Sequence, residues 1–214
     1  MMGKGVYRLV DAARYAHLPY ATLRSWFKGR TDGAGRGAIL KSEYQPIDGD
    51  FAVSFLDLIE AYVARFFYTE NIPTSRIRAV YKKMKREMGV SHPFAHADLC
   101  CGDGRIIIES DAALVDALDR QNWFTEMRSY LSHIEYGSIT KLADRWNIAE
   151  GVVIDPGVGF GKPVVKQTGI TTFVLAGQYN ANDKNAPLVA DLYGVKPSDV
   201  VNAVSFESEY GIAA

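Results

Sequence analysis

Residues 7–30 read YRLVDAARYAHLPYATLRSWFKGR, and this stretch decides the fold of the N-terminal part of the chain. Two short helices are predicted here, at 10–16 and at 19–27. A His-Leu-Pro step separates them, and proline suits the first turn of a new helix. Two helices joined by so short a turn are typical of a helix-turn-helix, whose second helix enters the major groove of DNA.

The side chains of the second helix divide into an inner and an outer face. A helix-turn-helix needs a small residue where its helices cross, an apolar residue in the turn and an apolar stripe on the second helix; Ala13, Leu18 and the pair Leu23 and Trp26 supply these. Polar side chains must then point outward to base edges and phosphates. The candidate DNA-binding residues are Tyr20, Thr22, Arg24, Ser25, Lys28, Arg30, Arg36 and Lys41. The alternative interpretation is an αα-hairpin in a protein core, with its charges in solvent.

The charge distribution favours DNA over this alternative. The whole chain has a formal net charge of -1, which by itself argues against nucleic acid. Residues 1–44, however, carry eight Lys or Arg and three Asp or Glu, a net charge of +5. Residues 74–89 carry six Lys or Arg and one Glu, again a net charge of +5. Segregated basic blocks indicate one face that meets phosphates, although the second block could also be a solvated helix face.

The segment after the helix pair predicts a wing and two longer helices. Two short strands are expected, at 38–40 and 44–47, after a glycine-rich stretch. Ser54 is a good N-cap for a buried helix that runs to Glu70. A further helix is expected at 74–88.

The rest of the chain changes character twice. The middle is less regular, with a β-branched strand expected at 106–108. Three helices are then expected, at 171–181, 186–193 and 196–210. The predicted fold is therefore α+β and mainly α. Its parts are a winged helix-turn-helix domain at 1–90, a mixed α/β middle region at 91–150 and a three-helix domain at 151–214.

Composition excludes several classes of protein. Hydrophobic residues make up 48% and charged residues 23% of the chain, an ordinary globular balance. No apolar run approaches the roughly 18 residues that would cross a bilayer, and the N-terminus lacks an apolar signal segment. The two cysteines, Cys100 and Cys101, are adjacent, which suits neither a disulfide nor a zinc pair. We therefore expect a cytoplasmic protein without a membrane partner.

The motifs that would indicate catalysis or a cofactor are incomplete. The loop before Gly161-Lys162 has Pro156 where a phosphate-binding loop needs its first glycine. His92 and His96 have metal-ligand spacing, but Pro93 lies between them and no third ligand is near in sequence. No nucleophile–base pair is evident. We expect no enzyme activity, no cofactor and no metal site.

Both ends of the chain resemble known families. Residues 7–30, here called the head, are similar to the DNA-binding head of MerR-type and excisionase-type proteins. The T-x-R-x-W motif of those proteins appears as Thr22-Leu23-Arg24-Ser25-Trp26. Residues 152–210, here called the tail, resemble a C-terminal domain of unknown function found in antitoxin-like proteins. Its motifs appear as Asp155-Pro156, Gly161-Lys162-Pro163, Thr168-Gly169-Ile170 and Asp191-Leu192-Tyr193-Gly194. One departure is Lys166-Gln167, which replaces the expected basic-Gly step before Thr168.

A MerR-like head joined to this tail is similar to the VapB-like antitoxins of type II toxin–antitoxin systems. The resemblance implies a homodimer that represses its own operon on double-stranded operator DNA and neutralises a PIN-domain ribonuclease toxin. Phe206, Tyr210 and Ile212 are the candidate toxin contacts, although such residues are more often part of a core. One alternative is a MerR-like regulator that responds to a small-molecule effector and has no toxin partner. A less favoured alternative is an enzyme.

Overall fold

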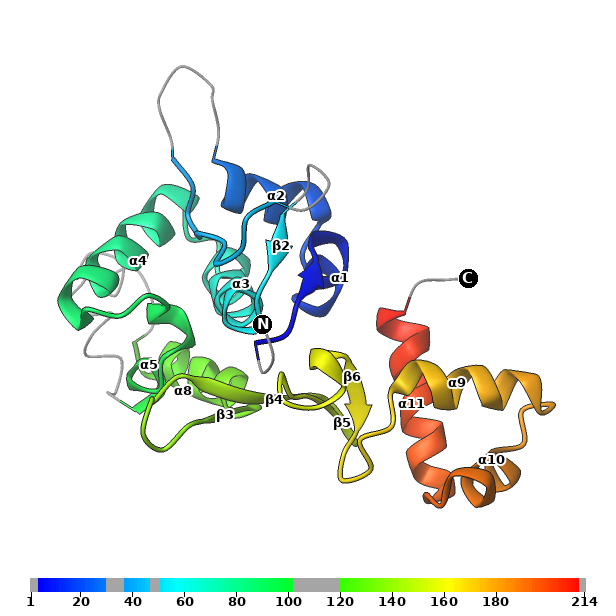
Figure 1. Cartoon of the computed structure of the whole chain (residues 1–214). Coiled ribbons are helices and arrows are strands. Elements are labelled where there is room, and N and C mark those ends of the chain that lie inside the picture. Colours follow the sequence, from blue (N-terminus) through cyan, green and yellow to red (C-terminus); the bar gives the residue numbers. More distant parts are fainter. Residues whose placement is uncertain (1–3, 30–36, 47–50, 102–119, 212–214) are drawn as a thin grey trace. The chain divides into compact units, whose positions relative to one another are not determined.

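The computed structural model describes residues 4–29, 37–46, 51–101 and 120–211 of the chain. They fall into two compact units (Figure 1). One unit is Val6–Ala143, and the other combines Met1–Gly5 with Asp144–Ala214. The three-part division expected from the sequence is finer than this and stays a prediction.

The first unit begins with the expected pair of helices. Strand β1 (Tyr7–Arg8) leads directly into α1 (Leu9–Tyr15), and α2 (Tyr20–Lys28) follows after a four-residue turn. Leu18 in that turn is buried, and its amide donates to the carbonyl of Ala13 at 2.8 Å. Gly29 ends α2 with a φ of 77°, a conformation that favours glycine. The helix pair therefore forms where the sequence places it.

The two strands expected for a wing do not form in the described part of the segment. Residues 37–46 are irregular, and the strand present is instead β2 (Ala52–Val53). It pairs antiparallel with β1, with Tyr7 opposite Val53. The wing strands were therefore wrong at 38–40 and at 44–46, and residue 47 lies outside the described residues. The physical reason is that strand pairing depends on a partner distant in sequence, which local β propensity does not identify.

The two longer helices form where the sequence predicts them. Helix α3 (Phe55–Thr69) starts from a capping box, in which the Ser54 side chain accepts from the Asp57 amide and the Asp57 carboxylate accepts from the Ser54 amide. Helix α4 (Thr74–Met88) ends at Gly89, whose φ of 66° is left-handed. α3 is buried along most of its length and forms the core of this unit.

Short elements complete the first unit. They are the 3₁₀ turn η1 (Pro93–Ala95), α5 (Asp98–Cys101), α8 (Arg120–Leu131) and β3 (Ile134–Tyr136). η1 packs on α3 and α4. The strand expected at 106–108 lies outside the described residues.

The C-terminal unit combines short strands with the three expected helices. Its elements are β4 (Ala143–Ala149), β5 (Val152–Ile154), η2 (Gly159–Gly161), β6 (Pro163–Val165), α9 (Thr172–Ala181), α10 (Ala186–Tyr193) and α11 (Pro197–Tyr210). Within this unit, β5 pairs antiparallel with both β4 and β6. α11 packs against α9 and α10 over a core that contains Leu175, Val189 and Val200. In the part of the chain that the structure describes, no helix combines the length and apolar character needed to cross a membrane.

Candidate functional site

The inner face of α2 is anchored firmly to the rest of the unit. Leu23, Trp26 and Phe27 are buried, and the Trp26 ring meets the edge of Tyr68 from α3 at 5.7 Å. The Trp26 carbonyl accepts hydrogen bonds from the amides of Ile39 and Leu40 at 2.8 and 3.2 Å. The segment after α2 is therefore attached to its last turn, and the helix has a defined outer face.

The side chains expected to meet DNA lie on that outer face. Tyr20 and Lys28 are exposed, and the residues between them that were expected to contact DNA, Thr22, Arg24 and Ser25, are half-buried. The Ser25 hydroxyl donates to the Thr22 carbonyl at 2.7 Å, so it is engaged within the helix. Tyr20, Arg24 and Lys28 follow one another at four-residue spacing and so share a helix face, and the role of all these residues in DNA binding stays a prediction.

Two cations of α2 have no side-chain partner among the residues that the structure describes. Among the described residues, Arg24 and Lys28 make no hydrogen bond or ion pair through their side chains. Arg8 and Arg14 differ, because both approach Asp11, at 2.8 and 3.8 Å. Free cations on an exposed helix are available for phosphates or base edges. Of the other candidates, Lys41 is exposed, and Arg30 and Arg36 lie outside the described residues.

The basic face of α4 is partly used inside the protein. Lys83 lies 3.8 Å from Glu87, and the Lys85 ammonium donates to the Ser91 carbonyl at 3.0 Å. Lys82 and Arg86 are exposed. The face therefore has fewer available cations than its sequence indicates.

The tail residues expected to contact a toxin are interior. Phe206 and Tyr210 are 2% and 8% exposed, and their rings stack at 4.7 Å. Ile212 lies outside the described residues. Burial makes Phe206 and Tyr210 poor candidates for a docking surface, and their role in toxin binding stays a prediction. The same unit does expose large apolar side chains, with Phe160 at 81%, Phe173 at 75% and Leu192 at 62%.

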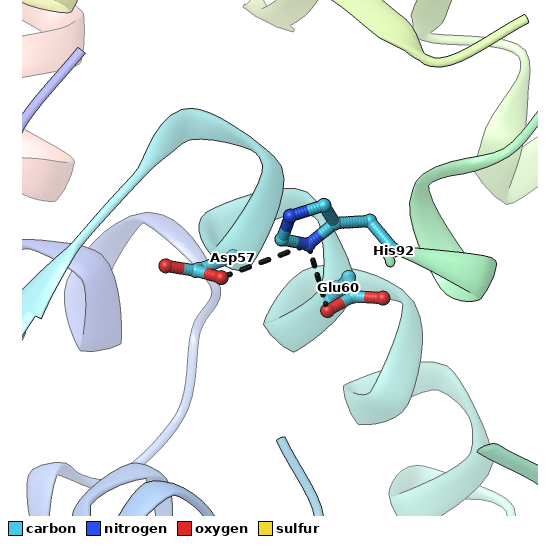
Figure 2. A group of neighbouring side chains, drawn as sticks. All are labelled: Asp57, Glu60 and His92. Carbon is cyan, nitrogen blue, oxygen red and sulfur yellow. Dashed lines mark hydrogen bonds and ion pairs between the residues drawn. The ribbon is translucent and has the colours of Figure 1, made fainter. Parts of the chain in front are cut away.

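A buried polar cluster lies in the first unit, at the start of α3 (Figure 2). Asp57 and Glu60 come from the first two turns of α3, and His92 precedes η1. The His92 Nδ1 atom lies 3.3 Å from Glu60 Oε2 and 3.7 Å from Asp57 Oδ1. Both carboxylates have a side-chain exposure of 0%. The three side chains therefore converge on one buried point.

Hydrogen bonds from the surrounding chain hold both carboxylates. Glu60 Oε1 accepts from the Phe94 amide at 3.3 Å, and its Oε2 accepts from the Tyr81 hydroxyl at 3.0 Å. Asp57 Oδ2 accepts from the amides of Glu43 and Ser54, each at 3.0 Å. Asp57 Oδ1 accepts no hydrogen bond in the described structure, although it is buried.

Burial decides the protonation tendencies of these carboxylates. Burial raises the pKa of Asp57, although hydrogen bonds from two backbone amides lower it. Burial also raises the pKa of Glu60, although the hydrogen bond to His92 lowers it. Burial alone lowers the pKa of His92, but the hydrogen bond to Glu60 and the two carboxylate charges outweigh it, so the net pKa is raised. The cluster therefore favours a positive charge at its centre.

Sequence reasoning missed this cluster. It compared His92 with His96, which is also buried but lies instead 3.7 Å from Asp98. A signal was present in the spacing of Asp57 and Glu60, because residues three apart share a helix face, and this helix is otherwise strongly apolar. Two carboxylates inside an apolar helix indicate a buried partner, but the sequence does not say which residue it is.

The structure thus defines a two-unit protein of mixed α and β structure, with an anchored helix pair that exposes cations and a separate helical tail. Residues 152–206 of the tail match the family described as "Protein of unknown function (DUF433)". The chain is also 26% identical over 223 residues to a protein of Mycobacterium tuberculosis (strain ATCC 25618 / H37Rv) named "Putative antitoxin VapB45", a match that covers 93% of this chain and 92% of that one.

A solved structure has the same fold. The crystal structure of Rv2018 from Mycobacterium tuberculosis matches with a TM-score of 0.74 and 25% identity, over 92% of this chain and 96% of that chain. Over most of its length the chain is therefore similar to a protein named as an antitoxin, and its fold is that of a solved structure. The MerR-like character of the head is a separate prediction that they do not test.

Proposed function

We propose that this protein is an antitoxin that neutralises a PIN-domain ribonuclease toxin by direct binding and represses its own operon by binding operator DNA. The observation that carries the proposal is the match over 93% of the chain to the protein named "Putative antitoxin VapB45". An antitoxin acts by binding, which agrees with the expectation that this chain is not an enzyme.

The helix pair supports the DNA-binding part. α2 is fixed from behind by buried Trp26 and exposes Lys28 at its C-terminal end. Arg24, one turn earlier, has no partner among the described residues. A rigid helix with unpaired cations on its outer face suits the major groove, where arginine pairs with guanine. We further propose a homodimer, because paired half-sites multiply affinity.

The exposed apolar side chains of the C-terminal unit support the toxin-binding part. Phe160, Phe173 and Leu192 are each more than half exposed. A contiguous apolar patch in solvent marks an interaction site, and aromatic residues are frequent among the side chains that dominate binding energy. We place the toxin contact among these residues rather than at the buried Phe206 and Tyr210.

The experiment is co-expression with the product of the neighbouring toxin gene, followed by affinity purification and size-exclusion chromatography. The wild-type chain should co-purify with the toxin and suppress its ribonuclease activity. Phe173→Glu and Leu192→Glu should each weaken the complex at least about tenfold, since one central contact of this kind contributes about 2 kcal/mol or more.

Ile139→Glu is the matched control. Ile139 is 94% exposed and apolar, but it belongs to the other compact unit. It should leave toxin binding unchanged. A folded chain that binds operator DNA but never co-purifies with that neighbour would be a regulator without a toxin partner.

A further inference from the structure

The buried cluster of Asp57, Glu60 and His92 has a net negative charge when both carboxylates are ionised. Two carboxylates and one imidazole are net negative even when His92 is protonated. In the described part of the chain, neither carboxylate has a lysine or arginine partner. Burying uncompensated charge is strongly unfavourable, so such groups either take up protons or bind a cation.

The distances within the cluster suit a bound metal ion. Zinc binds histidine nitrogen and carboxylate oxygen at about 2.0–2.2 Å in a tetrahedron, which separates neighbouring ligand atoms by about 3.3–3.5 Å. The separation of His92 Nδ1 from Glu60 Oε2 is 3.3 Å, and its separation from Asp57 Oδ1 is 3.7 Å. All three ligand atoms lie within 4.8 Å of one another. The two separations from His92 Nδ1 are therefore close to those of neighbouring ligands in a tetrahedral site.

The unused oxygen of Asp57 is an independent observation that points to a ligand. Asp57 Oδ1 is fully buried and accepts no hydrogen bond in the described structure, while Oδ2 is held by two backbone amides. The amides fix the carboxylate and leave Oδ1 facing the His92 ring (Figure 2). Buried polar atoms normally have a partner, and a cation between Oδ1 and Nδ1 would supply it.

We propose that Asp57, Glu60 and His92 form a binding site for a divalent transition-metal ion, of which zinc is the one to test. A histidine nitrogen among the ligands favours zinc or another transition metal over calcium and magnesium, which prefer oxygen ligands in larger or more hydrated sites. The ion would join the start of α3 to the segment that precedes η1. This inference is independent of the proposed antitoxin activity.

The test uses the purified full-length chain, stripped with a chelator and then loaded with zinc. After desalting, elemental analysis should find one zinc per chain, and thermal unfolding should shift upward with zinc. X-ray absorption should show only nitrogen and oxygen ligands near 2.0–2.1 Å, because cysteine ligation by Cys100 or Cys101 would appear at about 2.3 Å. A chain that retains no stoichiometric zinc, or binds it through sulfur, overturns the proposal.

Asp57→Asn is the decisive variant. An asparagine retains an oxygen that can accept from the amides of Ser54 and Glu43, and it replaces only the charged ligand atom. Zinc affinity should fall at least about tenfold. Loss of a residue that only holds a ligand in place already costs about that much, and Asp57 is proposed as a ligand itself. Equal affinity in a folded Asp57→Asn protein overturns the proposal.

Two controls separate ligand loss from other effects. Ser54→Ala weakens the same capping box but leaves all three ligands, so zinc binding should persist. His133→Gln removes an exposed histidine elsewhere and should also leave binding unchanged. If Asp57→Asn does not fold, His92→Gln is measured in its place, and retention of full affinity there overturns the proposal equally.

Discussion

Arg24→Ala tests whether α2 reads DNA. Arg24 has no hydrogen bond or ion pair among the described residues, so its removal should change the free energy of unfolding by no more than about 0.5 kcal/mol. A lost guanine contact costs about 1–3 kcal/mol of binding free energy. Because 1.4 kcal/mol is tenfold in affinity, the dissociation constant for operator DNA should rise by about 5- to 150-fold.

The assay is fluorescence anisotropy with an operator duplex and a scrambled duplex at two salt concentrations. A base contact predicts that affinity falls on the operator more than on the scrambled duplex, whereas a phosphate contact predicts equal losses and a salt slope smaller by about 0.9. Lys28→Ala is the matched phosphate variant and should give the second pattern. Unchanged affinity on both duplexes for both variants would refute the role of this helix face.

Three further predictions concern stability. Trp26→Ala should lower the free energy of unfolding by about 3–5 kcal/mol in urea titration, because it removes a buried ring from the inner face of α2. Asp155→Ala should cost about 1–2 kcal/mol in the same titration, because Asp155 Oδ1 accepts from the Gly157 amide at 2.8 Å and Oδ2 accepts from the Arg145 guanidinium at 2.8 and 3.1 Å. Asp155→Asn should cost less, because an asparagine oxygen can still accept from the Gly157 amide. Burial raises the pKa of Tyr130 above its ordinary 10.0, more than its contacts with Arg65 and Tyr62 lower it. The neutral phenol is therefore the form that stabilises the fold, its contribution is complete below pH 10, and stability should fall as pH rises through the higher folded pKa. Tyr130→Phe should show a weaker alkaline loss when melting temperature is followed against pH, and an identical loss would contradict this explanation.

Helix boundaries could be predicted from the sequence because their signals are local. Ser54 starts α3 through a hydrogen bond to an amide three residues away, and Gly89 ends α4 through its own backbone angle. In the C-terminal unit, Pro197 lies at the start of α11 and Gly194 at the end of α10. Each of these effects needs only a few neighbouring residues, so a linear pattern contains it.

Features that depend on distant residues could not be predicted in this way. β1 finds its partner at Ala52–Val53 rather than in the segment directly after α2. The partner of His92 is Glu60, which lies more than thirty residues earlier in the chain. The spacing of the residues pointed instead to His96. Burial of Phe206 and Tyr210 likewise depends on tertiary packing, which their apolar character indicates but does not determine.

The pairing of β1 with β2 determines when the head can fold during synthesis. Tyr7 pairs with Val53 in the β1–β2 sheet, and the Trp26 ring packs against the Tyr68 ring of α3. A nascent chain that ends soon after α2 therefore lacks both contacts. A peptide of the first thirty or so residues should therefore remain largely unfolded in isolation. Any shorter version of the protein made to study DNA binding has to extend at least to the end of α3.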